Sequence, residues 1–573
     1  MPSSHMPDIQ FTTYLRPHEV EAALKGFSEE YPHLCSLEPI GTSYEGRPIW
    51  CATLTNRATG PDTEKSAFWL DANIHATEVT GCMGALHLIQ RVLTAYGADE
   101  RITRLLDERA LYVVPCLNPD GMEQALTSPV YVRSGTRRYP YTEEREGLYP
   151  EDIDGDGLIL QMRVEDPDGG WKVSPRDPRL MRRREPDEYG GTYYRIFTEG
   201  RIRGYDGYTV KVAPPAQGLD FNRNFPMAWA PEGLQRGAGP FPLSEPETRA
   251  AVAFLAAHPN VHGAISYHTY SGAILRPYSD RPDEKMPIDD LWTYQEIGRR
   301  GEELTGYKHV SVFHGFRYHP REVMSGAFDD WVYDHLGVFG FTVELWDMIG
   351  AAGIKDRDFI EWFRDHPEED DLKLLAWNDE HLGGKGFVNW RPFNHPELGR
   401  VEIGGWIERR TFGNPPEPFL LQTLEPNTEF VIAHALMGPR LELRQASAEP
   451  LGEGLFRVRA VAANSGYLPT YGSKRALEIK AVRPIEVRLE LPPGAELLTG
   501  EALVEIGQLE GRANKRGIFG AGANPTDNLR KLEWTVRASE GGTLRIVASS
   551  QRAGTARATL QLTGCDVTSC SQW

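Results

Sequence analysis

Short apolar runs alternate with helical patterns of apolar residues through the N-terminal part of the chain. Residues 67–70, 110–117 and 339–345 are mostly apolar and have the length of buried strands. After the first run, apolar side chains recur at the spacing of a helix, at Val79, Cys82, Met83, Leu86, Ile89 and Leu93. Because strands alternate with helices, the pattern predicts an α/β sheet with helices on both faces.

Residues 139–215 break this pattern. The segment is rich in Gly, Pro, Asp and Arg, and we interpret it as a long insertion without a core of its own. It contains Asp152, Asp154 and Asp156 at the spacing with which a calcium-binding loop begins, although Arg163 stands where an EF-hand has its closing Glu. These three residues therefore indicate either a bound calcium ion or an Asp/Gly-rich turn.

Strict alternation of apolar and charged residues marks the C-terminal part. It is clear over residues 485–491 and 532–537, and Pro- and Gly-containing turns separate the short segments. This pattern predicts an antiparallel β-sandwich. We therefore predict an α/β domain over residues 1–440, which includes the insertion, and a β-sandwich domain over residues 441–573.

Composition narrows the possible partners. The chain of 573 residues has a net charge of −19, which argues against nucleic acid and anionic membranes as partners. It contains no apolar run long enough for a transmembrane helix, and its first residues do not form a secretory signal. The compartment therefore stays open between secreted, periplasmic and cytoplasmic. Cys565 and Cys570 form either a local disulfide or two free thiols.

Candidate metal ligands stand at the ends of predicted strands. His75 and Glu78 follow the run at 67–70, and their spacing of three residues lets both side chains reach one ion. His268 ends another predicted strand over residues 261–267 and supplies a third ligand. Imidazole and carboxylate donors suit zinc, and a catalytic zinc site has three protein ligands and an open position.

Glu344 lies inside the apolar run at 339–345. A carboxylate in such a strand is costly unless another group offsets it. The residue is either the partner of a buried arginine or a general base whose pKa is tuned beside a metal.

Six short motifs, in this order, resemble the zinc carboxypeptidases of the carboxypeptidase A-like family, of the bacterial type with a C-terminal β domain. They are His75-Ala-Thr-Glu78, Asn118-Pro-Asp-Gly121, Asp220-Phe-Asn-Arg-Asn-Phe225, His268-Thr-Tyr270, Asp330-Trp331 and Phe341-Thr-Val-Glu344. The resemblance covers residues 27–346 without the insertion. It implies a mixed central β-sheet flanked by helices, to which the predicted β-sandwich is appended.

The resemblance also implies roles for single residues. It implies that His75, Glu78 and His268 bind one zinc ion, and that Glu344 takes a proton from the attacking water and delivers it to the leaving amine. It further implies that Arg133 stabilises the tetrahedral oxyanion. From the residues alone, the alternative is that Arg133 is a surface arginine in a basic stretch.

The expected substrate is a peptide with a free C-terminus. The resemblance implies that Arg223, with Asn222, binds the terminal carboxylate, and a guanidinium matches a carboxylate through two parallel hydrogen bonds. Asp329 falls at the side-chain pocket, where an acidic residue favours substrates that end in Lys or Arg; alternatively, it only caps the following helix.

The sequence departs from the family at two positions. Thr77 stands where the family often has an arginine, which puts one outer substrate contact in doubt. The position of the mobile catalytic tyrosine falls near Glu322, and Tyr318 is close enough to substitute for it.

Three functions fit these patterns. The first is a carboxypeptidase, for which Arg223 argues. The second is a related zinc amidase or endopeptidase acting on cell-wall or modified peptides. The third is a binding protein on an inactive scaffold, which the presence of all three ligands and Glu344 disfavours.

Overall fold

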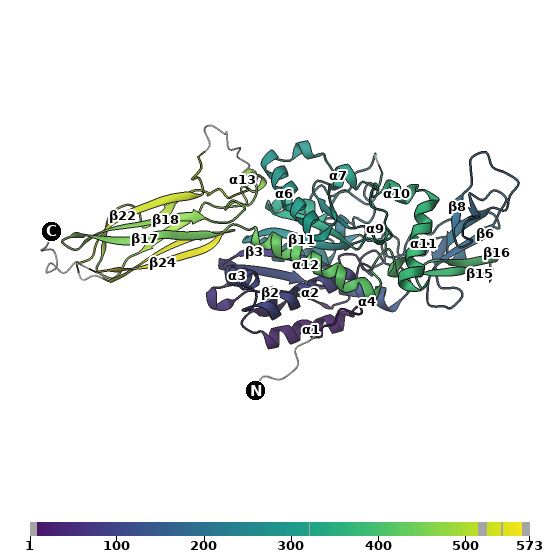
Figure 1. The fold of residues 1–573 in the computed structure, drawn as a ribbon, viewed down its shortest axis with the longest axis horizontal. Coiled ribbons are helices and arrows are strands. Elements are labelled where there is room, and N and C mark those ends of the chain that lie inside the picture. The colour runs from purple at the N-terminus through teal and green to yellow at the C-terminus, as the bar shows by residue number, and fades with distance from the viewer. Residues whose placement is uncertain (1–8, 320, 514–523, 540–541, 564–573) are drawn as a thin grey trace.

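The computed structural model describes residues 9–319, 321–513, 524–539 and 542–563. The helices are α1 (Pro17–Glu30), α2 (Thr80–Ala95), α3 (Glu100–Glu108), α4 (Pro119–Thr127), α5 (Pro246–Ala257), α6 (Ile288–Thr305), α7 (Val312–Gly315), α8 (Phe328–Leu336), α9 (Met348–Ala351), α10 (Glu361–Arg364), α11 (Glu368–Leu382), α12 (Leu420–Leu436) and α13 (Lys474–Glu478). Three parts follow one another along the long axis in Figure 1: the C-terminal strands, a central α/β unit and a smaller sheet at the far end.

The central sheet has eight strands and is mixed. Its order is β1 (Cys35–Thr42), β2 (Pro48–Leu54), β4 (Arg109–Val114), β3 (Ser66–Ala72), β11 (Val261–Thr269), β14 (Phe339–Leu345), β12 (Ala273–Arg276) and β13 (Lys308–Ser311). The four inner strands β4, β3, β11 and β14 run parallel, whereas β1, β2 and β12 form antiparallel pairs. This confirms the mixed central sheet that the motifs implied.

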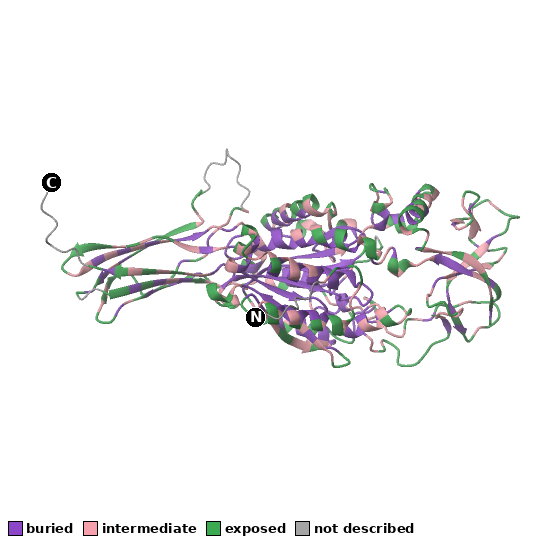
Figure 2. Ribbon diagram, turned by 60° about the horizontal axis from the view of Figure 1, so that its bottom comes forward, coloured by how far each residue is buried: buried purple, intermediate pink, exposed green. Residues whose placement is uncertain are grey.

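Helices cover both faces of this sheet, as predicted. Phe430 of α12 and Tyr294 of α6 pack against Phe341 of β14 on one face. Phe254 of α5 packs against Trp69 of β3 on the other. The parallel strands β3, β4 and β11 are buried along their whole length, as expected of strands covered on both sides, and in β14 only Glu344 is partly exposed. Figure 2 shows the most continuous burial in this central unit.

The insertion differs from its prediction, because it contributes to a second sheet with a small core. The order of this six-stranded sheet is β15 (Phe387–His395), β16 (Gly399–Trp406), β6 (Gln161–Glu165), β9 (Tyr194–Thr198), β7 (Trp171–Val173) and β8 (Met181–Arg183), beside the pair β5 (Gly147–Pro150) and β10 (Gly200–Arg203). Met162 of the insertion packs with Val401 and Ile403 of β16. The expectation of no core was wrong because β15 and β16, far along the chain, complete it.

The C-terminal strands form two antiparallel four-stranded sheets. One has the order β17 (Leu441–Gly452), β18 (Leu455–Asn464), β22 (Leu529–Arg537) and β20 (Glu496–Thr499); the other has the order β21 (Leu503–Glu505), β19 (Glu486–Glu490), β23 (Gly542–Ser550) and β24 (Gly554–Leu562). Val458 and Trp534 of the first sheet share a core with Val487 and Ile546 of the second. This confirms the predicted β-sandwich.

Two further observations concern the described residues. None of their helices is long and apolar enough to cross a membrane. The disulfide considered for Cys565 and Cys570 lies outside the described residues.

Candidate metal centre and substrate site

The candidate metal ligands meet at one edge of the central sheet because β3 and β11 are adjacent and parallel. The chain leaves β3 through Asn73, which has a positive φ of 61°. The Asn73 amide donates hydrogen bonds to the backbone oxygens of His75 (2.9 Å) and Ala76 (3.3 Å) and so fixes the loop before α2. His268 is near the end of β11, so the neighbouring strand presents its imidazole to the same loop.

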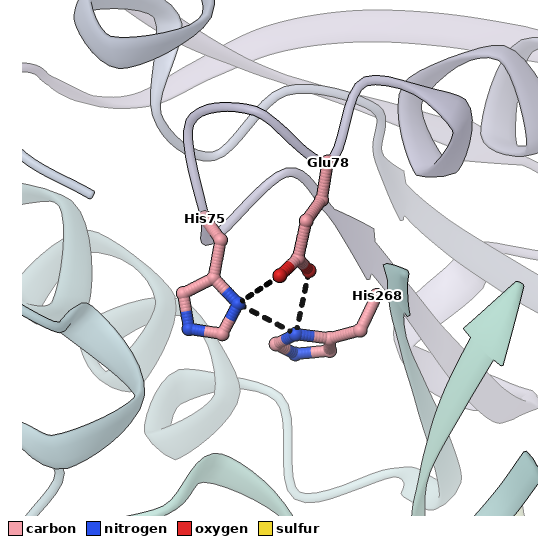
Figure 3. Close-up of side chains that lie close together, drawn as sticks. All are labelled: His75, Glu78 and His268. Atoms are coloured by element: carbon pink, nitrogen blue, oxygen red, sulfur yellow. Dashed lines mark hydrogen bonds and ion pairs between the residues drawn. The ribbon is translucent and has the colours of Figure 1, made fainter. Parts of the chain in front are cut away.

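His75, Glu78 and His268 converge on one point (Figure 3). Glu78 Oε1 is 2.8 Å from His75 Nδ1, and Glu78 Oε2 is 3.0 Å from His268 Nδ1. The two Nδ1 atoms are 3.0 Å apart. Two ring nitrogens that face each other at this distance, with a carboxylate beside both, suit a shared cation. Two imidazoles and one carboxylate are a donor set that fits zinc.

The Nε2 atom of each imidazole has a polar partner on the side away from Glu78. His268 Nε2 lies 3.3 Å from Ser266 Oγ, which in turn donates to Asp71 Oδ1 at 2.7 Å. His75 Nε2 lies 3.0 Å from Asp220 Oδ1. Such partners orient a ligating imidazole and fix which nitrogen faces the metal. Both Nδ1 atoms are therefore left for the ion.

Asp71 and Asp220 are two contributors that the sequence did not single out. Burial raises the pKa of Asp71 to about 7, although hydrogen bonds from Ser266 and Trp69 act to lower it. Asp220 begins a motif that was noticed for its arginine. The sequence shows that Asp220 is the first residue of this motif, but it does not give the direction of the side chain.

Arg133 lies against the metal ligands. Its Nη1 is 3.0 Å from Glu78 Oε1, and its Nε is 3.1 Å from Asp220 Oδ2. Burial acts to lower the pKa of Arg133, but the carboxylates of Asp220 and Glu78 outweigh it and hold that pKa well above its usual range. The structure thus places Arg133 in the site rather than on an open surface.

Glu344 is the register partner of His268 on the neighbouring strand β14. No hydrogen bond or ion pair within the described part of the chain involves its carboxylate, so it is not the partner of a buried arginine there. Burial, followed by the charge of Glu78, raises the pKa of Glu344 well above its usual range, while Arg133 and Arg223 act to lower it. Glu344 is therefore close enough to Glu78, a candidate metal ligand, and to Arg133 for their charges to act on its pKa.

Arg223 and Asn222 lie in a short 3₁₀ turn, Phe221–Arg223, and both are buried. Arg223 donates from Nη1 to the backbone oxygen of Asn222 (2.7 Å) and from Nη2 to Met324 Sδ (3.2 Å). No carboxylate of the described residues forms an ion pair with it. Asn222 Oδ1 accepts a hydrogen bond from the Phe328 backbone N–H at 2.8 Å, which holds the turn against α8.

Asp329 and Tyr318 are also near these groups. Asp329 is buried in the first turn of α8, where burial raises its pKa to about 6 and the charge of Arg223 opposes the shift. Tyr318 is 53% exposed. Partial burial raises the pKa of Tyr318, and the charges of Arg133, Arg223 and Glu344 also act on it. Both residues thus adjoin the site.

The aspartates of the insertion are close together but are already partnered. Asp152, Asp154 and Asp156 bring carboxylate oxygens within 4.8 Å of one another. Backbone N–H groups of the same loop donate to all three side chains. Arg391 of β15 forms ion pairs with Asp154 and Asp156.

Comparison with known proteins identifies two regions of the chain. A family model described as zinc carboxypeptidase matches residues 20–350, more than half of the chain, and a domain of unknown function matches residues 440–561. Carboxypeptidase B2 of Rattus norvegicus is 25% identical over 346 residues, which are 59% of this chain and 64% of that protein. Carboxypeptidase A6 of Mus musculus is 23% identical over 359 residues, or 60% and 62% of the two chains.

The chain thus spans less than two thirds of the length of these relatives. A crystal structure of thrombin activatable fibrinolysis inhibitor is similar with a TM-score of 0.43 and 20% identity, covering 76% of this chain and 77% of that one. On the extent of the family match, this chain belongs to the zinc carboxypeptidase family, a family of metal-dependent hydrolases.

Proposed function

We propose that this protein is a zinc-dependent carboxypeptidase that hydrolyses the last peptide bond of peptides with a free C-terminus. The observation that carries the proposal is the contrast between two neighbouring arginines. Arg133 has two carboxylate partners, whereas Arg223 is buried and forms no ion pair with a carboxylate of the described residues. A buried guanidinium without an anionic partner is costly unless a ligand supplies one.

A terminal carboxylate is the anion that matches this site. The guanidinium of Arg223 offers a planar pair of donors, and Asn222 is fixed beside it by its bond to Phe328. Binding the terminal carboxylate at Arg223 would set the last peptide bond beside Glu344 and the metal ligands. This requirement for a free C-terminus separates a carboxypeptidase from an endopeptidase.

His75, Glu78 and His268 are the residues that would hold zinc. Zinc, when bound at such a site, supplies a Lewis acid that polarises the scissile carbonyl and makes water acidic enough to react near neutral pH. Nη2 of Arg133 makes no hydrogen bond within the described residues. This nitrogen would donate a hydrogen bond to the developing oxyanion.

Glu344 is the general base of the proposed reaction. Its carboxylate has no competing partner in the described residues. A cation held by His75, Glu78 and His268 would act to lower its raised pKa, so that the ionised form can accept a proton from the attacking water. The water oxygen forms a bond to the carbonyl carbon, the C–N bond breaks, and Glu344 returns the proton to the leaving amine. Tyr318, at the edge of the site, would close over the bound residue.

Asp329 is proposed to select the last side chain. It lies close enough to Arg223 for their charges to interact, and an acidic group there would favour a C-terminal Lys or Arg. The alternative is that its carboxylate serves mainly the first turn of α8, where it interacts with the backbone N–H of Asp330.

The test uses peptides that differ only at the C-terminus: Lys, Arg, Phe, Leu, Glu and a C-terminal amide. We expect stepwise loss of single residues, blocked by the amide and by Glu344→Gln, with Lys and Arg preferred. Mass spectrometry identifies the products. Internal cleavage, or equal cleavage of the amide, would reject the role of Arg223 and favour the amidase or endopeptidase. A preference for Phe or Leu would reject the role of Asp329 alone.

We also propose the division into a catalytic domain over residues 1–440 and a C-terminal domain over 441–573. Separate apolar cores in the two parts support it. Calcium at Asp152, Asp154 and Asp156 is a separate proposal, supported by the convergence of three carboxylates. Because Arg391 already neutralises two of them, we expect calcium to bind only in competition with that arginine.

A further inference from the structure

A short segment that neither family model covers contacts two loops and one strand end of the candidate site. Residues 407–415 follow β16 and contain one 3₁₀ turn, Glu408–Arg410. The family models match residues 20–350 and 440–561, so neither includes this segment. We call residues 407–415 the strap.

Arg409 binds the segment that leads to Arg133. Its guanidinium donates to backbone oxygens rather than to a carboxylate: to Ala125 (2.7 Å) and Ser128 (2.8 Å) from Nη1, and to Pro129 (2.9 Å) and Val130 (3.2 Å) from Nη2. These oxygens belong to the end of α4 and to the stretch just before Arg133. One side chain therefore fixes the path by which Arg133 enters the site.

Asn414 binds the loop that carries His75 and Glu78. Its Oδ1 accepts hydrogen bonds from Thr80 N (3.1 Å) and Thr80 Oγ1 (2.7 Å). Its Nδ2 donates to Thr77 O at 2.8 Å and to Arg409 O at 3.1 Å. Asn414 is buried, so water does not readily replace these bonds. The amide thus holds the backbone on both sides of Glu78.

Thr411 binds the end of β14. Its backbone oxygen accepts a hydrogen bond from Trp346 Nε1 at 2.5 Å, two residues after Glu344. Trp346 has a positive φ of 72°, which non-glycine residues seldom adopt without support. The strap therefore contacts the loop of a metal ligand, the loop of Arg133 and the end of the strand of Glu344.

We propose that the strap is a positioning element of the active site, with Asn414 setting the geometry of the metal-binding loop and Arg409 setting the position of Arg133. Asn414 acts on zinc affinity, and Arg409 acts on the rate of the chemical step. The part concerning Arg409 rests on the proposed carboxypeptidase activity, whereas the part concerning Asn414 does not.

The physical argument depends on side-chain shape. A guanidinium carries donors in a fixed planar fork and reaches four carbonyls, whereas a lysine ammonium cannot reproduce that arrangement. An asparagine amide offers an acceptor and a donor together, and here both are used. The side chain of Arg410, the next residue, is exposed and makes no hydrogen bond or ion pair within the described residues. It provides a matched control.

The first experiment measures zinc affinity of the full chain by competition with a chelator of known affinity. Asn414→Ala should weaken zinc binding roughly 10- to 100-fold, as loss of groups that orient ligands commonly does. Arg410→Ala should bind zinc as the parent does. Thermal melting confirms that each variant is folded. Zinc affinity of a folded Asn414→Ala within twofold of the parent would overturn this part, whether or not the protein cleaves peptides.

The second experiment is a double-mutant cycle with a peptide substrate at saturating zinc. Arg409→Ala and Arg409→Lys should lower kcat by about tenfold or more with little change in KM, because a displacement of about 1 Å in a catalytic group is costly. In an Arg133→Ala background, the same changes should have almost no further effect on kcat. Additive losses in kcat would show that Arg409 only stabilises the fold and would overturn its positioning role. Absence of cleavage by the parent would instead reject the proposed function.

Discussion

The described residues contain two clusters of potential metal ligands that differ in their surroundings. His75, Glu78 and His268 are buried at the edge of the central sheet, and partners behind both imidazoles leave their Nδ1 atoms for an ion. Asp152, Asp154 and Asp156 lie in a more open loop of the insertion. There, Arg391 and the backbone of the loop already bind the carboxylates. Side chains converge in both clusters. Only in the first do the ligand atoms also point toward one shared position without an arginine bound between them.

The comparison teaches that the groups around a ligand set are as informative as the ligands. A carboxylate bound by an arginine must lose that ion pair before it binds a cation. An imidazole held through its outer nitrogen is already oriented for a metal. The first cluster should therefore bind its metal tightly and the second weakly.

The largest effect is expected from removing a ligand of the buried cluster. His268→Ala should abolish stoichiometric zinc binding and lower kcat/KM by at least about 10³-fold, because the Lewis acid of the reaction is lost. Metal analysis after dialysis, together with peptide hydrolysis, measures both. Asp154→Ala is the matched control and should leave zinc content unchanged. Full zinc content in His268→Ala would show that the ion lies elsewhere.

Removal of the Arg223 guanidinium, which has no carboxylate partner among the described residues, should have the next largest effect. Arg223→Met should raise KM for peptides with a free C-terminus by roughly 10²-fold, since a site built to bind a charged group loses about that much when the group is gone. Zinc content should not change, which separates this variant from loss of a ligand. A parental KM would mean that another residue binds the carboxylate.

Features of the fold and of the site that depend on a short local pattern could be predicted from the sequence, whereas those that depend on contacts between distant segments could not. The strands β3 and β11, which end at Ala72 and Thr269, were predictable from apolar runs, and adjacent parallel strands bring their carboxyl ends to the same edge of a sheet. The candidate ligands and Glu344 followed from short motifs. The strap was not predictable, because Arg409 and Asn414 act mainly through backbone groups far away in the sequence, which carry no sequence signal. The core of the insertion was missed for a related reason, since β16 completes it from far along the chain.

The insertion's cluster should respond weakly to calcium. Arg391→Gln removes the competing cation and should increase calcium affinity about tenfold or more over the parent, because the charges of Asp154 and Asp156 are then no longer neutralised. Isothermal titration with CaCl₂ measures the change, and Asp152→Asn in the Arg391→Gln background is the control. No heat from Arg391→Gln at millimolar calcium would show that the loop is only a turn.

The smallest effect is expected at a single buried carboxylate, whose Oε2 has no hydrogen-bond partner among the described residues. Glu247 lies in the first turn of α5, and burial raises its pKa to about 7, although the backbone N–H of Tyr44 opposes the shift. A raised folded-state pKa means that folding favours the protonated form, so stability is lost as pH rises from about 4.5 to about 7. Glu247→Gln cannot ionise and should be about 1–3 kcal/mol more stable than the parent at pH 8 and nearly equal to it at pH 4.5. Urea unfolding at both pH values measures this difference. An equal gain at both would assign the effect to the new amide contacts instead of to the charge.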